Sequence, residues 1–163
     1  MMILRDGELV IRNAEASDAG LLGSWWRDGA IMAHAGYPDG MDITDEQIKK
    51  QVLSCRDDTF RLFIIEISGE AKGEMSYHSM GNNTVQMAIY ISDASLRNKG
   101  YGTRLIHMLT VELFNTFDKI VLDVHPDNTH ARHVYEKLGF RKRPASNDYE
   151  LNKIDFTGKT SYN

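Results

Sequence analysis

Residues 97–102, with the sequence Arg-Asn-Lys-Gly-Tyr-Gly, constrain the fold of this chain more than any other segment. They follow an apolar, branched run at 85–91 and open a stretch, 101–117, whose apolar residues recur at helical spacing. A Gly-Tyr-Gly run also makes an ordinary turn between a strand and a helix. However, Gly100 and Gly102 allow backbone N–H groups at the helix start to point outward at one spot. The free N–H groups and the helix dipole favour an anion there, so the segment predicts a phosphate or pyrophosphate site.

Strands and helices are predicted along the whole chain from periodicity and turn residues. Strands are expected at 9–12, 61–68, 73–80, 84–92, 119–125, 140–143 and 149–154, helices at 18–27, 44–55, 101–117 and 128–138, and a loop at 29–42. The three middle strands suit an antiparallel meander, and 119–125 suits a buried strand beside 84–92. This order predicts an α/β (α+β) fold, with a single mixed, mostly antiparallel sheet and helices on both faces.

Length and composition limit the classes of protein that fit. The 163 residues suit one domain, expected at 1–156, with a loose C-terminal tail at 157–163. The net charge of −4 argues against a nucleic-acid binder, and no apolar run is long enough for a membrane span. The N-terminus lacks the features of a signal peptide, and one cysteine, Cys55, fits a reducing compartment. These features predict a cytoplasmic protein without membrane or nucleic-acid partners.

A second motif lies further along the chain, at 128–140. It contains Asn128, Ala131 and Tyr135 and ends in Gly139-Phe140. Together with 97–102 it resembles the GCN5-related N-acetyltransferase (GNAT) family, which uses acetyl-coenzyme A. The resemblance implies transfer of an acetyl group to a primary amine by direct attack in a ternary complex. The acceptor is expected to be a small molecule, such as a polyamine or aminoglycoside, or a protein N-terminus, and a homodimer is left open. The alternative is a non-catalytic acyl-coenzyme A binding or sensor module.

The resemblance also assigns the residues that hold the coenzyme. Main-chain N–H groups of the loop at 97–103 would bind the diphosphate, and a gap between two splayed parallel strands would expose backbone groups to the pantetheine arm. Asn128 would bind pantetheine, although it also suits a helix N-cap. The implied cofactor-binding residues are Ile89, Tyr90, Ile91, Arg97, Asn98, Lys99, Gly100, Tyr101, Gly102, Thr103, Val124 and Asn128.

Two catalytic residues are expected from the same resemblance. Tyr135 would protonate the departing thiolate, for which a phenol is a credible acid. A base is needed because a lysine-type amine, with a pKa near ~10.4, is protonated at neutral pH. Asp123 is the first candidate, with Glu74 and His125 in reserve. Many family members carry a glutamate on the strand before the loop, where this chain has Gln86, which cannot act as a base.

Two further groups of residues suit either a functional role or an ordinary structural role. His125, His130 and His133 do not have the spacing of a standard zinc site, and no metal is expected. Acidic and aromatic residues between the first strand and the meander suit recognition of an amine-bearing cation, or simply a capped helix over a core. These residues are Asp39, Asp42, Asp45 and Glu46, with Trp25, Trp26 and Tyr37 nearby.

Overall fold

The computed structural model describes residues 3–158. Eight strands form one sheet in the order β1-β2-β3-β4-β5-β6-β8-β7, and only the β5–β6 pair is parallel. The strands are β1 (Ile3–Asp6), β2 (Leu9–Asn13), β3 (Phe60–Ile67), β4 (Glu70–Gly81), β5 (Thr84–Ile91), β6 (Lys119–Leu122), β7 (Arg141–Lys142) and β8 (Tyr149–Asn152). The helices are α1 (Ala19–Trp26), α2 (Gly29–Met32), α3 (Asp45–Leu53), α4 (Tyr101–Leu113) and α5 (Thr129–Lys137), and short 3-10 turns are η1 (Ala16–Asp18), η2 (Ala33–Ala35), η3 (Ala94–Leu96) and η4 (Lys153–Asp155).

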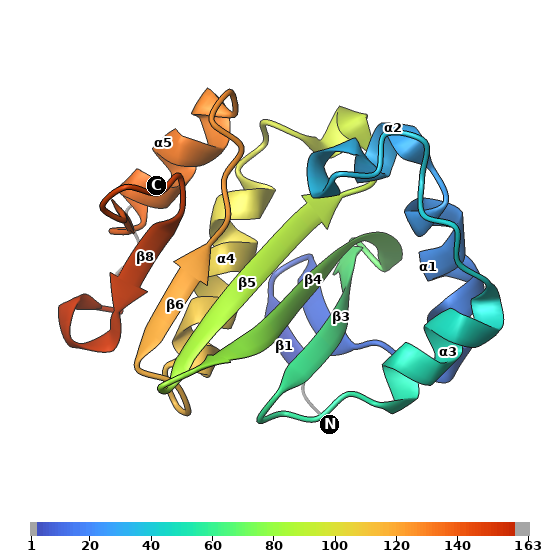
Figure 1. The fold of residues 1–163 in the computed structure, drawn as a ribbon, viewed down its shortest axis with the longest axis horizontal. Helices are drawn as coiled ribbons and strands as arrows, with labels where there is room; N and C mark the ends of the chain where they lie inside the picture. The colour runs from blue at the N-terminus through green and yellow to red at the C-terminus, as the bar shows by residue number, and fades with distance from the viewer. Residues whose placement is uncertain (1–2, 159–163) are drawn as a thin grey trace.

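Helices cover both faces of the sheet, as the sequence predicted. Alternate residues of β3 show why, because Phe63 packs in the core with α4 and α5, whereas Ile64 packs in the core with α1 and α3. Figure 1 shows α1, α2 and α3 gathered on the right of the view and α4 and α5 on the left. The prediction of a mixed, mostly antiparallel sheet is confirmed. None of the helices within residues 3–158 is long and apolar enough to cross a membrane.

Several element bounds differ from those predicted. Strand β1 was missed, although it forms a hairpin with β2 through Gly7, whose φ is +58°. The predicted loop at 29–42 contains α2, capped by the Asp28 side chain, and η2. Helix α4 ends at Leu113 because the chain then tightens into turns that keep Phe114 and Phe117 buried. The apolar spacing therefore continued past the end of the helix.

The C-terminal strands are shorter than expected. β6 ends at Leu122 rather than at 125, because its pairing with both β5 and β8 stops there. The predicted final hairpin is present as β7 and β8, but β8 lies between β6 and β7 in the sheet. The predicted loose tail lies outside the described residues apart from Thr157 and Gly158.

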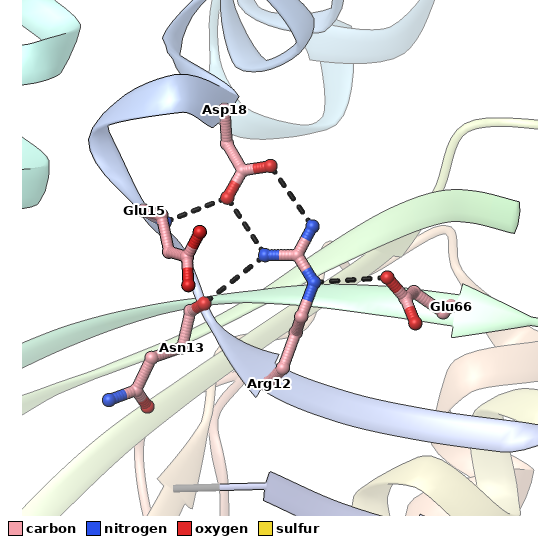
Figure 2. A network of polar contacts seen from close by, with 5 residues as sticks. All are labelled: Arg12, Asn13, Glu15, Asp18 and Glu66. Atoms are coloured by element: carbon pink, nitrogen blue, oxygen red, sulfur yellow. Dashed lines mark hydrogen bonds and ion pairs between the residues drawn. The ribbon is translucent and has the colours of Figure 1, made fainter. Parts of the chain in front are cut away.

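An ion-pair network ties β2 and β3 to the turn before α1 (Figure 2). The Arg12 guanidinium donates to both carboxylate oxygens of Asp18, at 2.8 and 3.0 Å, and its Nε donates to Glu66 Oε2 at 3.0 Å. It also donates to the Asn13 carbonyl, and the Glu15 N–H donates to Asp18. Burial alone would raise the pKa of Asp18, but the hydrogen bonds from Arg12 and Glu15, with the charge of Arg12, lower that pKa overall.

Replacing Arg12 by methionine should lower the free energy of unfolding by about 2 kcal/mol, because Asp18 is left desolvated without its cation. The side chains of Arg12 and Asp18 are only 23% and 12% exposed. Urea unfolding at neutral pH measures the loss. Arg56→Met is the control, since Arg56 and Asp58 form an exposed pair, and it should cost under about 0.5 kcal/mol. Because the pKa of Asp18 is lowered, the Arg12 effect should fade as the pH falls below about 4. An equal loss at pH 2 and pH 7 would contradict this account.

Candidate active site

The loop before α4 has the conformation that the glycine pattern requires. Gly100 is the N-cap of α4 with φ +83°, and Asn98 also has a positive φ, of +60°. A Cβ placed on Gly102 would find no protein atom within 4 Å. Internal packing therefore does not explain the glycine at this position, whereas close approach of a ligand to the backbone would. The first N–H groups of α4 are free of helical partners by geometry and suit an anion.

Strands β5 and β6 separate next to this loop. Their parallel pairing runs from Thr84–Lys119 to Met87–Leu122 and stops, while β5 continues to Ile91 against β4. The Ser92 N–H donates to the Lys72 carbonyl of β4 at 2.8 Å. Because backbone groups point alternately to the two sides of a strand, those of Ile89 and Ile91 point toward the β6 side. The Ile91 carbonyl accepts from Arg97 Nη2 at 3.1 Å. The gap leaves main-chain groups of β5 facing a space that no strand within residues 3–158 fills.

A cavity of about 730 Å³ joins the loop and the gap. Eleven predicted site residues line it, namely Ile89, Tyr90, Ile91, Arg97, Asn98, Gly100, Tyr101, Gly102, Thr103, Asn128 and Tyr135. Further walls come from α2, η2, η3, α4 and α5, through Ala30, Ile31, His34, Leu96, Ile106, His130, Ala131, His133, Val134 and Lys137. The walls from α2 and η2 lie within 29–42, the segment that was predicted as a loop.

Three predicted residues lie off the cavity walls. Lys99 is exposed on the loop, and Val124 packs its side chain in the core, where it is 4% exposed. Asp123, the first candidate for the base, is exposed just after β6 and does not line the cavity. The Asn128 side chain caps α5 by accepting from the Ala131 N–H at 3.0 Å, which confirms the N-cap role. Its amide nitrogen is a separate group that can donate to a ligand.

Tyr135 lies on α5 at the cavity wall and is 8% exposed. Its ring packs against Phe140 and Tyr149, with ring centroids 6.3 and 6.1 Å away. Burial, and secondly the charge of Asp123, raise the pKa of Tyr135 to about 12. The phenol therefore keeps its proton throughout the neutral range and has one to donate.

Asp123 does not line the cavity, and it interacts with two ionisable side chains, Asp148 and Tyr135. Burial, followed by interaction with Asp123, raises the pKa of Asp148, so the two carboxyl groups act on each other. Asp123 also acts on Tyr135. In this position Asp123 favours the protonated phenol. Its role as the base stays a prediction.

A buried carboxylate lies next to Tyr90, a residue of the cavity wall. Glu74 on β4 is 7% exposed and accepts hydrogen bonds from Trp26 Nε1 at 3.2 and 3.3 Å. Burial is the main cause that raises the pKa of Glu74 to about 7, while Trp26 and Tyr90 lower it. Glu74 and Tyr90 are directly opposite each other on β4 and β5, and Tyr90 lines the cavity. The sequence placed Glu74 in reserve only.

The structure also locates the tryptophans, acidic residues and histidines for which both a functional and a structural role were open. Trp25 and Trp26 are buried in the core with α1 and α3, and Asp45 pairs with Arg27 at 2.8 Å. The acidic residues of the 39–46 segment do not line the cavity. His130 and His133 are exposed and lie at the cavity wall, and no metal-binding cluster of side chains is found within residues 3–158.

Comparisons with known proteins agree with this geometry. The family model for the acetyltransferase (GNAT) domain matches residues 8–141. The aminoglycoside acetyltransferase AAC(6')-Ib in complex with ribostamycin and coenzyme A has a TM-score of 0.77 at 22% identity, covering 96% of this chain and 99% of its own. Spermidine N-acetyltransferase from Vibrio cholerae, in complex with coenzyme A and spermine, has a TM-score of 0.78 at 17% identity, covering 92% and 98%. The ribosomal α-N-protein acetyltransferase RimL, in complex with coenzyme A, has a TM-score of 0.74 at 16% identity, covering 93% and 98%. A search of curated proteins found no match.

The fold and the family match define the chain as an acyltransferase. It belongs to the GNAT acetyltransferase family, because the family model covers most of its length. As a member of this family it is an N-acetyltransferase, and its co-substrate is acetyl-coenzyme A.

Proposed function

We propose that this enzyme transfers the acetyl group of acetyl-coenzyme A to a small primary amine, such as a polyamine or an aminoglycoside, by direct attack within a ternary complex. One observation carries the proposal. A single cavity joins an anion-binding helix start, the unfilled gap beside β5 and the proton-bearing Tyr135. These three groups suit a diphosphate, an extended arm and a thioester.

The chain's own groups supply binding and proton transfer. The N–H groups after Gly100 would bind the diphosphate, Arg97 and Lys99 would add positive charge, and the backbone of Ile89 and Ile91 would pair with the pantetheine amides. Val124 would contribute only its backbone, because its side chain is buried. Tyr135 would protonate the leaving thiolate. When bound, acetyl-coenzyme A supplies the thioester that the amine attacks.

A small, strongly basic amine is favoured over a protein N-terminus by the groups at the acceptor end. An amine with a pKa near ~10 needs an effective proton acceptor at neutral pH, whereas an α-amine near ~7.8 needs little help. Glu74, whose pKa is about 7, is matched to the first task. Two of the similar structures hold an aminoglycoside or spermine, although RimL acts on a protein. Cys55 is a free thiol, and we place the reaction in the reducing cytoplasm.

A turnover screen tests this function. The purified chain is mixed with acetyl-coenzyme A and with spermidine, spermine, kanamycin, ribostamycin or short peptides with free N-termini, and release of coenzyme A is followed with a thiol reagent. We expect amine-dependent release with a polyamine or an aminoglycoside, and an acetylated amine by mass spectrometry. Turnover with peptides alone would move the acceptor to protein N-termini. Binding of acetyl-coenzyme A with no turnover of any amine would support the non-catalytic module instead.

A further inference from the structure

A cluster of polar side chains is buried behind the cavity wall. Glu74, Trp26 and Tyr90 meet there, from β4, α1 and β5. The carboxylate has one indole N–H shared between its two oxygens, whereas an ionised carboxylate can accept about four hydrogen bonds. A well-packed apolar residue or a glutamine would avoid this cost of burial. Burying a carboxylate with so few hydrogen bonds costs stability, so the cluster is a good candidate for proton chemistry.

Tyr90 separates this carboxylate from the cavity. Its hydroxyl is enclosed and has no hydrogen-bond partner among the described residues. Burial, and then the charge of Glu74, raise the pKa of the phenol, so a free phenolate does not form in the neutral range. The Tyr90 ring packs edge-on against Trp25, with ring centroids 6.0 Å apart, and at a tilt against His34, with centroids 5.5 Å apart. His34 is exposed and lines the cavity, so the Tyr90 ring lies beside a part of the cavity wall that solvent reaches.

We propose that Tyr90 and Glu74 form a proton relay for the acceptor amine, with Tyr90 in contact with the amine and Glu74 as the positioning residue behind it. Because the Tyr90 hydroxyl is enclosed, side chains around the ring, such as His34, must move for the acceptor to reach it. One N–H proton of the ammonium then passes to Tyr90 Oη as the phenolic proton passes to the Glu74 carboxylate. The neutral amine attacks the acetyl carbon, the N–C bond forms and the C–S bond breaks. Tyr135 gives its proton to the thiolate, and the second N–H proton of the newly acylated nitrogen leaves to solvent. Solvent then returns the proton held by Glu74 to Tyr135, so that one proton is released in each turnover.

The pH dependence follows from the groups that face Glu74. Among the described residues, the side chains that act on its pKa are Trp26 and Tyr90, and Ile64 is its neighbour across β3. Ionised Glu74 is the active form, so kcat/KM should rise with pH through an inflection near 7, the pKa of Glu74. Without the relay, only amine that solution has already deprotonated can react, so the inflection should move to the amine's own pKa, near ~10.

The experiment measures kcat/KM against pH, from 5.5 to 9.5, with spermidine and ribostamycin as acceptors and acetyl-coenzyme A saturating. Glu74→Gln and Tyr90→Phe should each lose on the order of a hundredfold at pH 7.5, recover most of it by pH 9.5, and lose little more when combined. Trp26→Phe removes the donor that lowers the pKa of Glu74, so its inflection should shift upward. Glu70→Gln, an exposed carboxylate on the same strand, is the matched control and should keep the wild-type profile.

The relay rests on the proposed function, and the outcomes separate the two. Wild-type enzyme that acetylates no amine would overturn both. Wild-type turnover with an inflection that persists in Glu74→Gln would overturn the relay alone. The same holds if Asp123→Asn, rather than Glu74→Gln, moves the inflection to the pKa of the amine. A pH-independent loss in Glu74→Gln would show a purely structural role and would also overturn it.

Discussion

Tyr135→Phe should lower kcat about a hundredfold and change the affinity for acetyl-coenzyme A by less than about threefold, because it removes a proton donor and little packing. General acid catalysis contributes ~10²–10⁴-fold when proton transfer limits the rate. The ring of Tyr135 is buried between Phe140 and Tyr149, and phenylalanine keeps these contacts. Steady-state kinetics give kcat, and calorimetry gives the affinity.

Tyr149→Phe is the matched control for Tyr135→Phe. Its ring touches Tyr135, but its hydroxyl donates to Glu136 at 3.0 Å and accepts from Arg132. This variant should lose some stability and keep kcat within about threefold, since its phenol is engaged in the fold. Equal loss of kcat in both variants would mean that packing around Tyr135, and not its proton, sets the rate. Full activity of Tyr135→Phe would assign protonation of the thiolate to water.

Gly102→Asp should weaken binding of acetyl-coenzyme A by at least about a hundredfold. The carboxylate would lie a few ångströms from the diphosphate, where like-charge repulsion at an effective dielectric of ~20 is worth roughly 3 kcal/mol, or more than a hundredfold in Kd. Isothermal titration calorimetry with coenzyme A measures the change. Gly102→Ala adds a Cβ that meets no protein atom within 4 Å, so it isolates the effect of size from that of charge.

The fold itself should tolerate the aspartate at 102. Gly102 is the second residue of α4, where a negative charge interacts favourably with the helix dipole. The melting temperature without coenzyme should therefore stay equal or rise slightly, which separates lost binding from lost folding. Unchanged affinity in Gly102→Asp would place the diphosphate away from this helix start.

How far the sequence predicted the structure depends on how local each signal is. The loop at 97–102 and the cap at Asn128 were predicted because their residue types act on their own backbone. Strand β1 was missed although Gly7-Glu8 forms a two-residue hairpin loop with glycine at its first position, since the four residues of β1 are at most partly buried and show no long pattern. Helix α2 is a single turn that begins at Gly29, and it is too short for a helical spacing of apolar residues to reveal it.

The candidate site was only partly predictable for the same reason. Trp26 and Glu74 are 48 residues apart in the sequence, and their hydrogen bond depends on how α1 crosses the sheet. The opposition of Glu74 and Tyr90 depends on the β4–β5 register, which a one-residue slip would abolish. No pattern in the sequence encodes either fact. The resemblance supplied Tyr135 and the loop, and Glu74 was only a reserve candidate, whereas its contacts with Trp26 and Tyr90 required the structure.

The short β5–β6 ladder has a mechanical consequence. Four residue pairs, Thr84–Lys119 to Met87–Leu122, form the whole seam between the strands β1–β5 and the strands β6, β8 and β7. A short seam opens locally at a lower free energy than the rest of a sheet. A ligand whose arm pairs with both sides acts as a removable extra strand, and it raises the cost of opening by RT ln(1 + [L]/Kd). In this enzyme the co-substrate would thus be a reagent and also a temporary part of the sheet.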